Sequence, residues 1–209
     1  GISGAYSYRL DVGDAGKLSF GLGAQIYRYR LYTDGLKFNN QANTDQAIAA
    51  GGDFRAFYPN FSFGAHYYAD KYYVGISIPE LIENRISSTT ESFILKKKRH
   101  YYLTGGYKFK IDDTYTLEPS LLVKYVAGAP VELDLNARLW AFDKFNLGIS
   151  YRTNDAVVLV LGFKFKNQYH IGYSYDLTTS SLKNHSSGSH EIMLGYDFIK
   201  TKGSSSKFE

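Results

Sequence analysis

The stretch IGYSY at 171–175 is repeated with variations along the chain. Its variants are LGISY at 147–151, LGFKF at 161–165 and LGYDF at 194–198, with looser versions VGISI at 74–78 and FGAHY at 63–67. Each places a glycine at the same step of a hydrophobic run, although glycine within a strand gives up side-chain packing and carries an entropic cost. The repeated glycine therefore indicates an environment that favours a missing side chain.

The composition favours β-structure in one domain. The 209 residues include 20 Tyr and 14 Phe but one Trp and one Met, and aromatic side chains suit a pleated surface. With four prolines, long uninterrupted strands are possible, and the absence of cysteine excludes disulfides, thiolate metal sites and cysteine nucleophiles. The net charge of +4 is mild, and we expect no nucleic-acid partner.

Membrane insertion by helices is excluded by the hydropathy pattern. No apolar run approaches the roughly 18 to 20 residues that a membrane-spanning helix needs. A transmembrane β-barrel remains possible, because its strands need only about 9–11 residues and alternate in polarity. The sequence begins at Gly1 without a signal peptide, so either a signal has been removed or the chain lacks its beginning.

Alternation with a period of two predicts about eleven strands. They lie near 2–10, 17–32, 59–69, 72–79, 99–110, 117–126, 131–142, 145–152, 156–166, 168–176 and 190–199. Turn residues separate most of them, which predicts a meander. The fold class is thus all-β, an antiparallel up-and-down transmembrane β-barrel, with the barrel at 1–199 and a polar C-terminal tail at 200–209.

Loop lengths predict an orientation. Three connections are long, at about 33–58, 80–98 and 177–189, and strand counting places all three on one side. Outer-membrane barrels have long extracellular loops and short periplasmic turns, so we expect the short turns and the C-terminus in the periplasm. A periplasmic N-terminus then requires an odd number of strands before Gly1, and we expect the chain to lack its beginning.

The repeated glycine always falls on the polar face of its strand. In a membrane barrel that face points into a crowded lumen, where a glycine makes room for long side chains from neighbouring strands. A soluble up-and-down barrel would turn the same face to water, where a missing side chain relieves nothing. We therefore predict a set of lumen-packing glycines: Gly64, Gly75, Gly148, Gly162, Gly172 and Gly195.

Aromatic residues gather near strand ends, as in the interfacial girdles of membrane barrels. The alternative is that they are ordinary strand-formers. The predicted interfacial aromatics are Phe145, Tyr151, Phe165, Tyr169, Tyr175 and Phe198.

No catalytic, cofactor-binding or metal site is predicted. The five histidines lack a metal-ligand spacing and no GxSxG motif occurs, so we expect no enzyme and no cofactor. Charges of both signs fall on the lumen face, where they would either pair across strands or be solvated. They are Glu118, Lys124, Glu132, Asp134, Arg138, Arg152, Lys164, Asp176 and Asp197. The basic run 96–99 is a solvated face or a contact for lipid phosphates or a partner.

Four segments resemble the PorP/SprF family of outer-membrane proteins of the type IX secretion system. They are GISGAYSYRL at 1–10, LSFGLGAQI at 18–26, YPNFSFGAHYYADKYYVGISIPELIENR at 58–85 and GSHEIMLGYDF at 188–198. The resemblance implies further strands before Gly1 and a full barrel of about fourteen. It also implies a non-enzymatic component of the machinery that exports surface proteins and gliding adhesins. No residue-level functional motif is carried over.

The expected partners follow from this resemblance. They are outer-membrane lipid and either periplasmic ring proteins or a secreted surface adhesin, without a small-molecule substrate. The alternative function is a passive outer-membrane porin or small-molecule transporter, and a third possibility is a soluble lipid-binding barrel.

Overall fold

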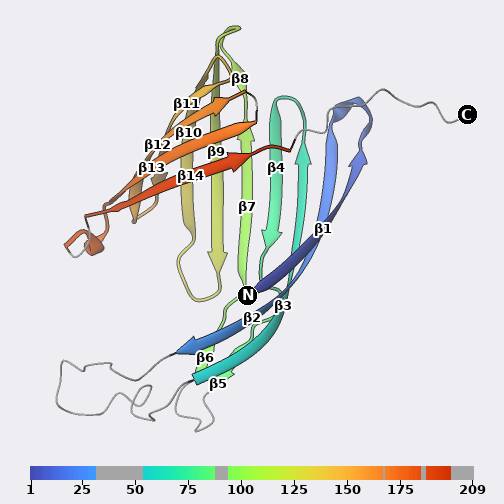
Figure 1. The fold of residues 1–209 in the computed structure, drawn as a ribbon, viewed down its shortest axis with the longest axis vertical. Helices are drawn as coiled ribbons and strands as arrows, with labels where there is room; N and C mark the ends of the chain where they lie inside the picture. The colour runs from blue at the N-terminus through green and yellow to red at the C-terminus, as the bar shows by residue number, and fades with distance from the viewer. Residues whose placement is uncertain (32–53, 88–93, 167, 185–186, 199–209) are drawn as a thin grey trace, which may run out of the picture. The chain divides into compact units, whose positions relative to one another are not determined.

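The computed structural model describes residues 1–31, 54–87, 94–166, 168–184 and 187–198 (Figure 1). Strands dominate these residues, with two short 3₁₀ segments, η1 (Gly13–Ala15) and η2 (Ser181–Asn184). The strands are β1 (Ile2–Asp11), β2 (Lys17–Leu31), β3 (Phe54–Tyr68), β4 (Tyr72–Ile78), β5 (Arg85–Ser87), β6 (Ile94–Lys96), β7 (His100–Tyr107), β8 (Phe109–Lys110), β9 (Tyr115–Val126), β10 (Glu132–Ala141), β11 (Phe145–Arg152), β12 (Ala156–Phe165), β13 (Tyr169–Thr178) and β14 (Ser189–Tyr196).

Twelve strands form one antiparallel up-and-down sheet. Its order is β1-β2-β3-β4-β7-β9-β10-β11-β12-β13-β14, with β8 paired to β9, and β1 and β14 are the ends of this order. The predicted strands match the strands of this path in number and order. Three differences stand out. β3 begins at Phe54 rather than at 59. A short β5–β6 hairpin lies inside the connection predicted as a loop at 80–98, and β14 ends at Tyr196 rather than at 199.

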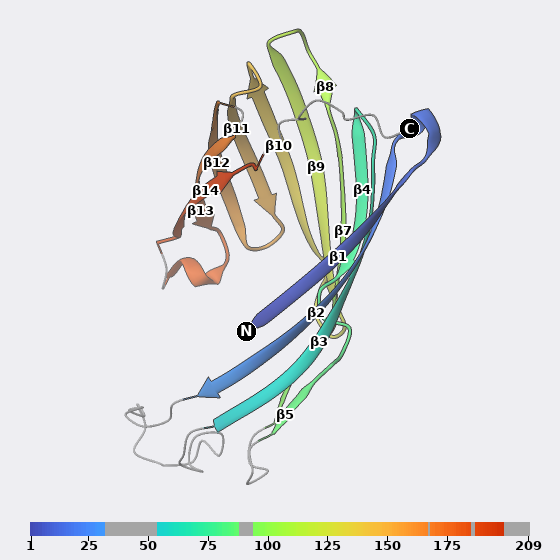
Figure 2. The same ribbon diagram turned by 45° about the vertical axis from the view of Figure 1, so that its right-hand side comes forward.

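The first compact unit comprises residues 1–104 and 123–131. Its longest ladder joins β2 to β3 over fifteen residue pairs from Lys17↔Tyr68 to Leu31↔Phe54, and β1 pairs with the first part of β2. In both ribbon views the β5–β6 hairpin lies beside the beginning of β3 (Figures 1 and 2). The three-residue strands of this hairpin are too short to show a periodic pattern, which is why alternation did not predict them.

The second compact unit comprises residues 105–122 and 132–209 and contains the consecutive hairpins from β10 to β14. Tight turns set their register. Phe142 and Asp143, between β10 and β11, have φ of 56° and 52°, the left-handed geometry that matches the twist of a two-stranded hairpin. Before β9, the Asp112 carboxylate accepts the backbone N–H groups of Thr114 and Tyr115, both at 2.7 Å.

Burial is inverted relative to a water-soluble domain. We call the side of each strand with the alternating hydrophobic residues the apolar face and the opposite side the polar face. In β13, Ile171 is 52% exposed, whereas Gly172 on the polar face is buried. Apart from glycines, the buried residues of the described chain are Tyr58, Asn60, Asp134 and Ala156. The sheet thus covers polar groups and exposes apolar ones, as a lipid-facing strand does.

Within the described residues, no helix combines the length and apolarity that a membrane span requires.

Candidate interaction surface

A buried asparagine fastens the connection after β4 to the polar face of β3. Asn60 is fully buried; its Nδ2 donates to the carbonyl of Ile82 at 2.9 Å, and its Oδ1 accepts the Ile82 N–H at 3.0 Å. The Asn84 side chain donates to the Pro59 carbonyl, and the Gln25 side chain in β2 donates to the Pro79 carbonyl. Residues 79–84, which we call the folded-back segment, therefore lie against β2 and β3.

Two cations of the basic run also contact the folded-back segment. Arg99 Nε donates to the Leu81 carbonyl at 3.0 Å, and its Nη2 donates to the same oxygen. Lys97 pairs with Glu80 and lies over the Tyr58 and Tyr27 rings, with Nζ 4.8 and 5.4 Å from their centroids. These two members of the run 96–99 therefore have defined partners, and they are not part of a merely solvated face.

The electrostatics of this connection favour the charged forms of its residues. Burial lowers the pKa of Lys97, but hydrogen bonds to Glu80 and Tyr58 outweigh it and leave this pKa above its ordinary value. The Arg99 backbone N–H, bonded at 3.2 Å, holds the pKa of the Glu83 carboxyl below its ordinary value, and Lys96 adds to this effect. Both ionised side chains thus stabilise the fold of the connection near neutral pH.

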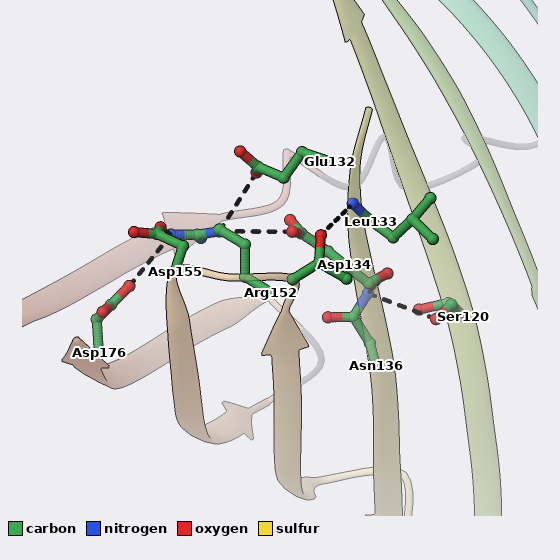
Figure 3. Close-up of polar contacts among 9 residues, drawn as sticks. Ser120, Glu132, Leu133, Asp134, Asn136, Arg152, Asp155 and Asp176 are labelled. Atoms are coloured by element: carbon green, nitrogen blue, oxygen red, sulfur yellow. Dashed lines mark hydrogen bonds and ion pairs between the residues drawn. The ribbon is translucent and has the colours of Figure 1, made fainter. Parts of the chain in front are cut away.

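The second polar cluster is centred on Arg152 at the end of β11 (Figure 3). Its Nη1 lies 3.0 Å from Asp155 Oδ2 and 3.3 Å from Asp176 Oδ2, and its Nε lies 3.4 Å from Asp134 Oδ1 and 3.6 Å from Glu132 Oε1. The four carboxylates come from β10, β13 and the β11–β12 turn. One guanidinium thereby ties together four consecutive strands of the second unit.

This arrangement bears on the predicted charged lumen face. Of the nine charges predicted there, Arg152 and three others, Glu132, Asp134 and Asp176, form these ion pairs, which agrees with the alternative of pairing across strands. The Asp134 Oδ1 and Arg152 Nε atoms are buried and lack a well-aligned hydrogen bond, so their 3.4 Å ion pair is electrostatic rather than directional. Glu118 accepts the Trp140 Nε1–H at 3.0 Å, a further contact on this face.

The predicted glycines lie opposite side chains on neighbouring strands. The ladders pair Gly75 with His66, Gly148 with Arg138, Gly162 with Asn146, Gly172 with Met193, Gly195 with His170, and Gly64 with Ser77. A Cβ at Gly75 would lie 2.8 Å from His66 Cδ2, and one at Gly162 would overlap the Asn146 amide. At Gly64 the nearest atom would be 3.6 Å away, so the need for glycine differs between positions.

Five of the predicted interfacial aromatics lie within strands. They are Phe145, Phe165, Tyr169, Tyr151 and Tyr175, in β11, β12 or β13, and the first four are about half exposed. Phe145, Phe165 and Tyr169 begin or end their strands and form part of a continuous series of ring contacts, Phe145–Phe163–Phe165–Tyr169–Tyr196. Phe198 lies beyond the end of β14, where it contacts the Tyr196 ring edge-on.

The histidines offer no metal centre in the described part of the chain, where no group of three His, Cys, Asp or Glu could hold an ion. His170 instead donates to Asp197 Oδ2 at 2.7 Å, and this bond holds the pKa of the Asp197 carboxyl below its ordinary value.

A comparison with protein families identifies the relatives of this chain. The family described as type IX secretion system membrane protein PorP/SprF matches residues 1–196. The chain belongs to the PorP/SprF family. No curated individual protein matches it. The match spans both units, and it confirms the resemblance found in the four sequence segments.

In this PorP/SprF protein, sequence reasoning missed the role of Asn60. The resemblance was most specific at 58–85, and both Asn60 and the folded-back segment lie in that stretch. A polar amide in the middle of an aromatic strand, next to Pro59, was an available signal, but its partners are about twenty residues away. The Trp140–Glu118 contact also went unpredicted because it joins residues of separate strands.

Proposed function

We propose that this chain is an outer-membrane β-barrel component of the type IX secretion and gliding machinery that acts by docking other proteins. The family supplies the secretion role. The inverted sheet, with its apolar face exposed and polar side chains covered, supports insertion in a lipid bilayer. The observation that carries the docking role is the folded-back segment, which turns a loop into an ordered surface held by hydrogen bonds and ion pairs.

The proposed barrel closes with the polar face around a lumen and the apolar face towards lipid. The longer connections, after β2, β4 and β13, would then be extracellular, and the short turns periplasmic. In that arrangement the folded-back segment lies inside the extracellular mouth of the lumen, fastened to β2 and β3 by Asn60 and Arg99. A secreted adhesin can bind to its ordered surface, whereas periplasmic ring proteins can bind to the short turns.

A passive porin is the second candidate, and the folded-back segment disfavours it. A segment fixed by several hydrogen bonds to the polar face of β2 and β3 narrows the proposed lumen. The Arg152 cluster ties charges of opposite sign together rather than lining a pore with one sign. We therefore expect the protein to be non-enzymatic and poorly conducting.

Two measurements separate these functions. Planar-bilayer recordings of the purified full-length protein should show rare or small openings. Affinity purification from outer membranes should recover type IX components or an exported adhesin, and a double substitution at Glu80 and Glu83, which disturbs the folded-back segment, should lower that recovery. A large stable conductance without any secretion partner would support the porin instead.

A further inference from the structure

An open groove crosses the apolar face of β1, β2 and β3. It has a volume of about 670 Å³, in the range of small-molecule sites, and apolar atoms form nearly all of its lining. Its floor is made of small residues, because the register places Gly4 beside Ala24, and a Cβ at Gly4 would meet no atom within 4 Å. The exposed side chains of Ile26 and Phe61 line the sides of the groove. Its lining runs along β2 from Ala24 to Arg28, about 14 Å at roughly 3.4 Å per residue, which suits an alkyl chain.

The cationic side chain of Arg28 lies where the apolar surface of the groove ends. The residues of β2 on the apolar face are Leu18, Phe20, Leu22, Ala24, Ile26 and then Arg28. Arg28 lines the groove, is exposed, and lies opposite Phe57, with its guanidinium carbon 5.6 Å from the centroid of that ring. Stacking on an aromatic ring uses the face of a guanidinium, whereas its N–H donors lie at the edge, where an anion can bind.

The two strands that hold Arg28 and Phe57 add no negative charge. Neither β2 nor β3 contains an Asp or Glu. A guanidinium without a carboxylate on its own or the paired strand attracts anions. Guanidinium groups bind phosphate in a bidentate geometry, more strongly than they bind neutral acceptors.

We propose that this groove binds a phosphorylated outer-membrane lipid, with an acyl chain along Gly4 and Ala24 and the phosphate at Arg28. The inference rests on the membrane location in the proposed function. It goes beyond it by assigning a lipid site with a preference for phosphate, in the leaflet that the long connections face. Free phosphate lacks the apolar part that the groove accommodates, so a lipid is its occupant.

Native mass spectrometry of the purified full-length protein in detergent tests the site. The probes are lipid A with its phosphate, the same lipid A after enzymatic removal of phosphate, and phosphatidylglycerol. We expect the phosphorylated lipid A to bind about tenfold more tightly than the dephosphorylated form, as a charge-assisted phosphate contact implies. Preferential binding of phosphatidylglycerol instead would overturn the assignment to the outer leaflet.

Two substitutions separate the contributions of charge and shape. Arg28→Gln should abolish the preference for phosphate while leaving binding of the dephosphorylated lipid unchanged. Ala24→Phe, which fills the groove, should weaken both lipids about tenfold, and Gly4→Val serves the same purpose if the phenylalanine variant does not fold. The controls are Arg138→Gln on the polar face and Ala141→Phe, which fills a second apolar groove of about 460 Å³ in the other unit.

The outcomes are distinct. A phosphate preference that survives Arg28→Gln, or an Ala141→Phe effect equal to that of Ala24→Phe, would overturn the site. Lipid binding is measured on the isolated protein, so the lipid site can be disproved while the proposed role in secretion still holds. Conversely, the role in secretion can be disproved while lipid binding is still found.

Discussion

The Asn60 amide binds both backbone groups of Ile82, donating to its carbonyl at 2.9 Å and accepting its N–H at 3.0 Å. Its Oδ1 also accepts the neighbouring Phe61 N–H at 2.9 Å. One fully buried side chain thus adds to the backbone bond from the Leu81 N–H to the Phe61 carbonyl, where β4 has ended and Pro79 cannot donate. Asn60 is the buried side chain among the several that hold the folded-back segment, and it both donates and accepts.

Replacing Asn60 by Leu should release this segment. Buried backbone groups that lose their partners cost about 1–3 kcal/mol, so we expect the free energy of unfolding in detergent to fall by that amount. Limited proteolysis should show faster cleavage between residues 79 and 99. Ser62→Ala, on the same face of β3, is the matched control. Equal cleavage of both variants would show that Asn60 does not hold the segment.

Replacing Arg152 by Met should destabilise the second unit. Four carboxylates would lose their shared cation. The cluster is partly exposed, so we expect a loss of about 1–3 kcal/mol, below the value of about 3–5 kcal/mol for a fully buried pair. Urea titration of the reconstituted protein measures this loss. Adding Asp134→Asn to this variant should recover part of the lost stability, because it reduces the repulsion among the remaining carboxylates. A double-mutant cycle then measures the interaction energy between Arg152 and Asp134. Arg138→Met, exposed on the same face, should have little effect; a comparable loss there would argue against a specific role for Arg152.

The glycine positions differ in their tolerance of alanine. Gly162→Ala should impair assembly, since its Cβ would overlap the Asn146 amide, whereas Gly64→Ala should assemble normally because its nearest contact would be an ordinary 3.6 Å. Gly172→Leu should be impaired as well, since a Cβ there already lies 3.3 Å from Met193 Cε. Heat-modifiable migration on gels measures assembly. If the Gly162 and Gly64 variants behave alike, the glycines are not required for packing across strands.

Acidification should loosen the connection that contains Glu83. The Arg99 N–H and Lys96 depress the pKa of this carboxyl, so its contribution to stability is present above the unfolded-state pKa and is lost as pH falls through the lower folded-state value. Protease susceptibility of residues 79–99 should therefore rise as the pH falls through the acidic range below the ordinary glutamate pKa. Glu83→Gln should remove this pH-dependent rise in protease susceptibility. If the rise persists in that variant, another titrating group causes it.

The strands were predictable because each carries its own signal. Alternation in β13, for example, places Ile171 and Tyr173 on one face and Gly172 on the other, and both the strand and the exposure of its apolar face are found. Turn residues such as Asp112 and Asn154 added the connections. Local periodicity also gave the end of each strand to within a few residues, although β3 begins earlier than predicted, at Phe54.

The clusters were less predictable because their partners come from different strands. The Arg152 cluster needs the register of four strands, and a shift of one residue would turn its members to the other face. Predicting the role of Asn60 requires the path of the connection after β4, and the sequence of that connection predicts only a loop. The predicted connection at 33–58 lies mostly outside the described residues, and the C-terminal tail at 200–209 lies wholly outside them.

The most direct test of the secretion role is the protein content of the culture medium and cell surface after deletion of the gene. If the protein docks type IX cargo or its machinery, quantitative proteomics should find at least one surface adhesin retained in the periplasm, and the full-length gene should restore its export. An unchanged set of exported proteins in the deletion strain would contradict the account.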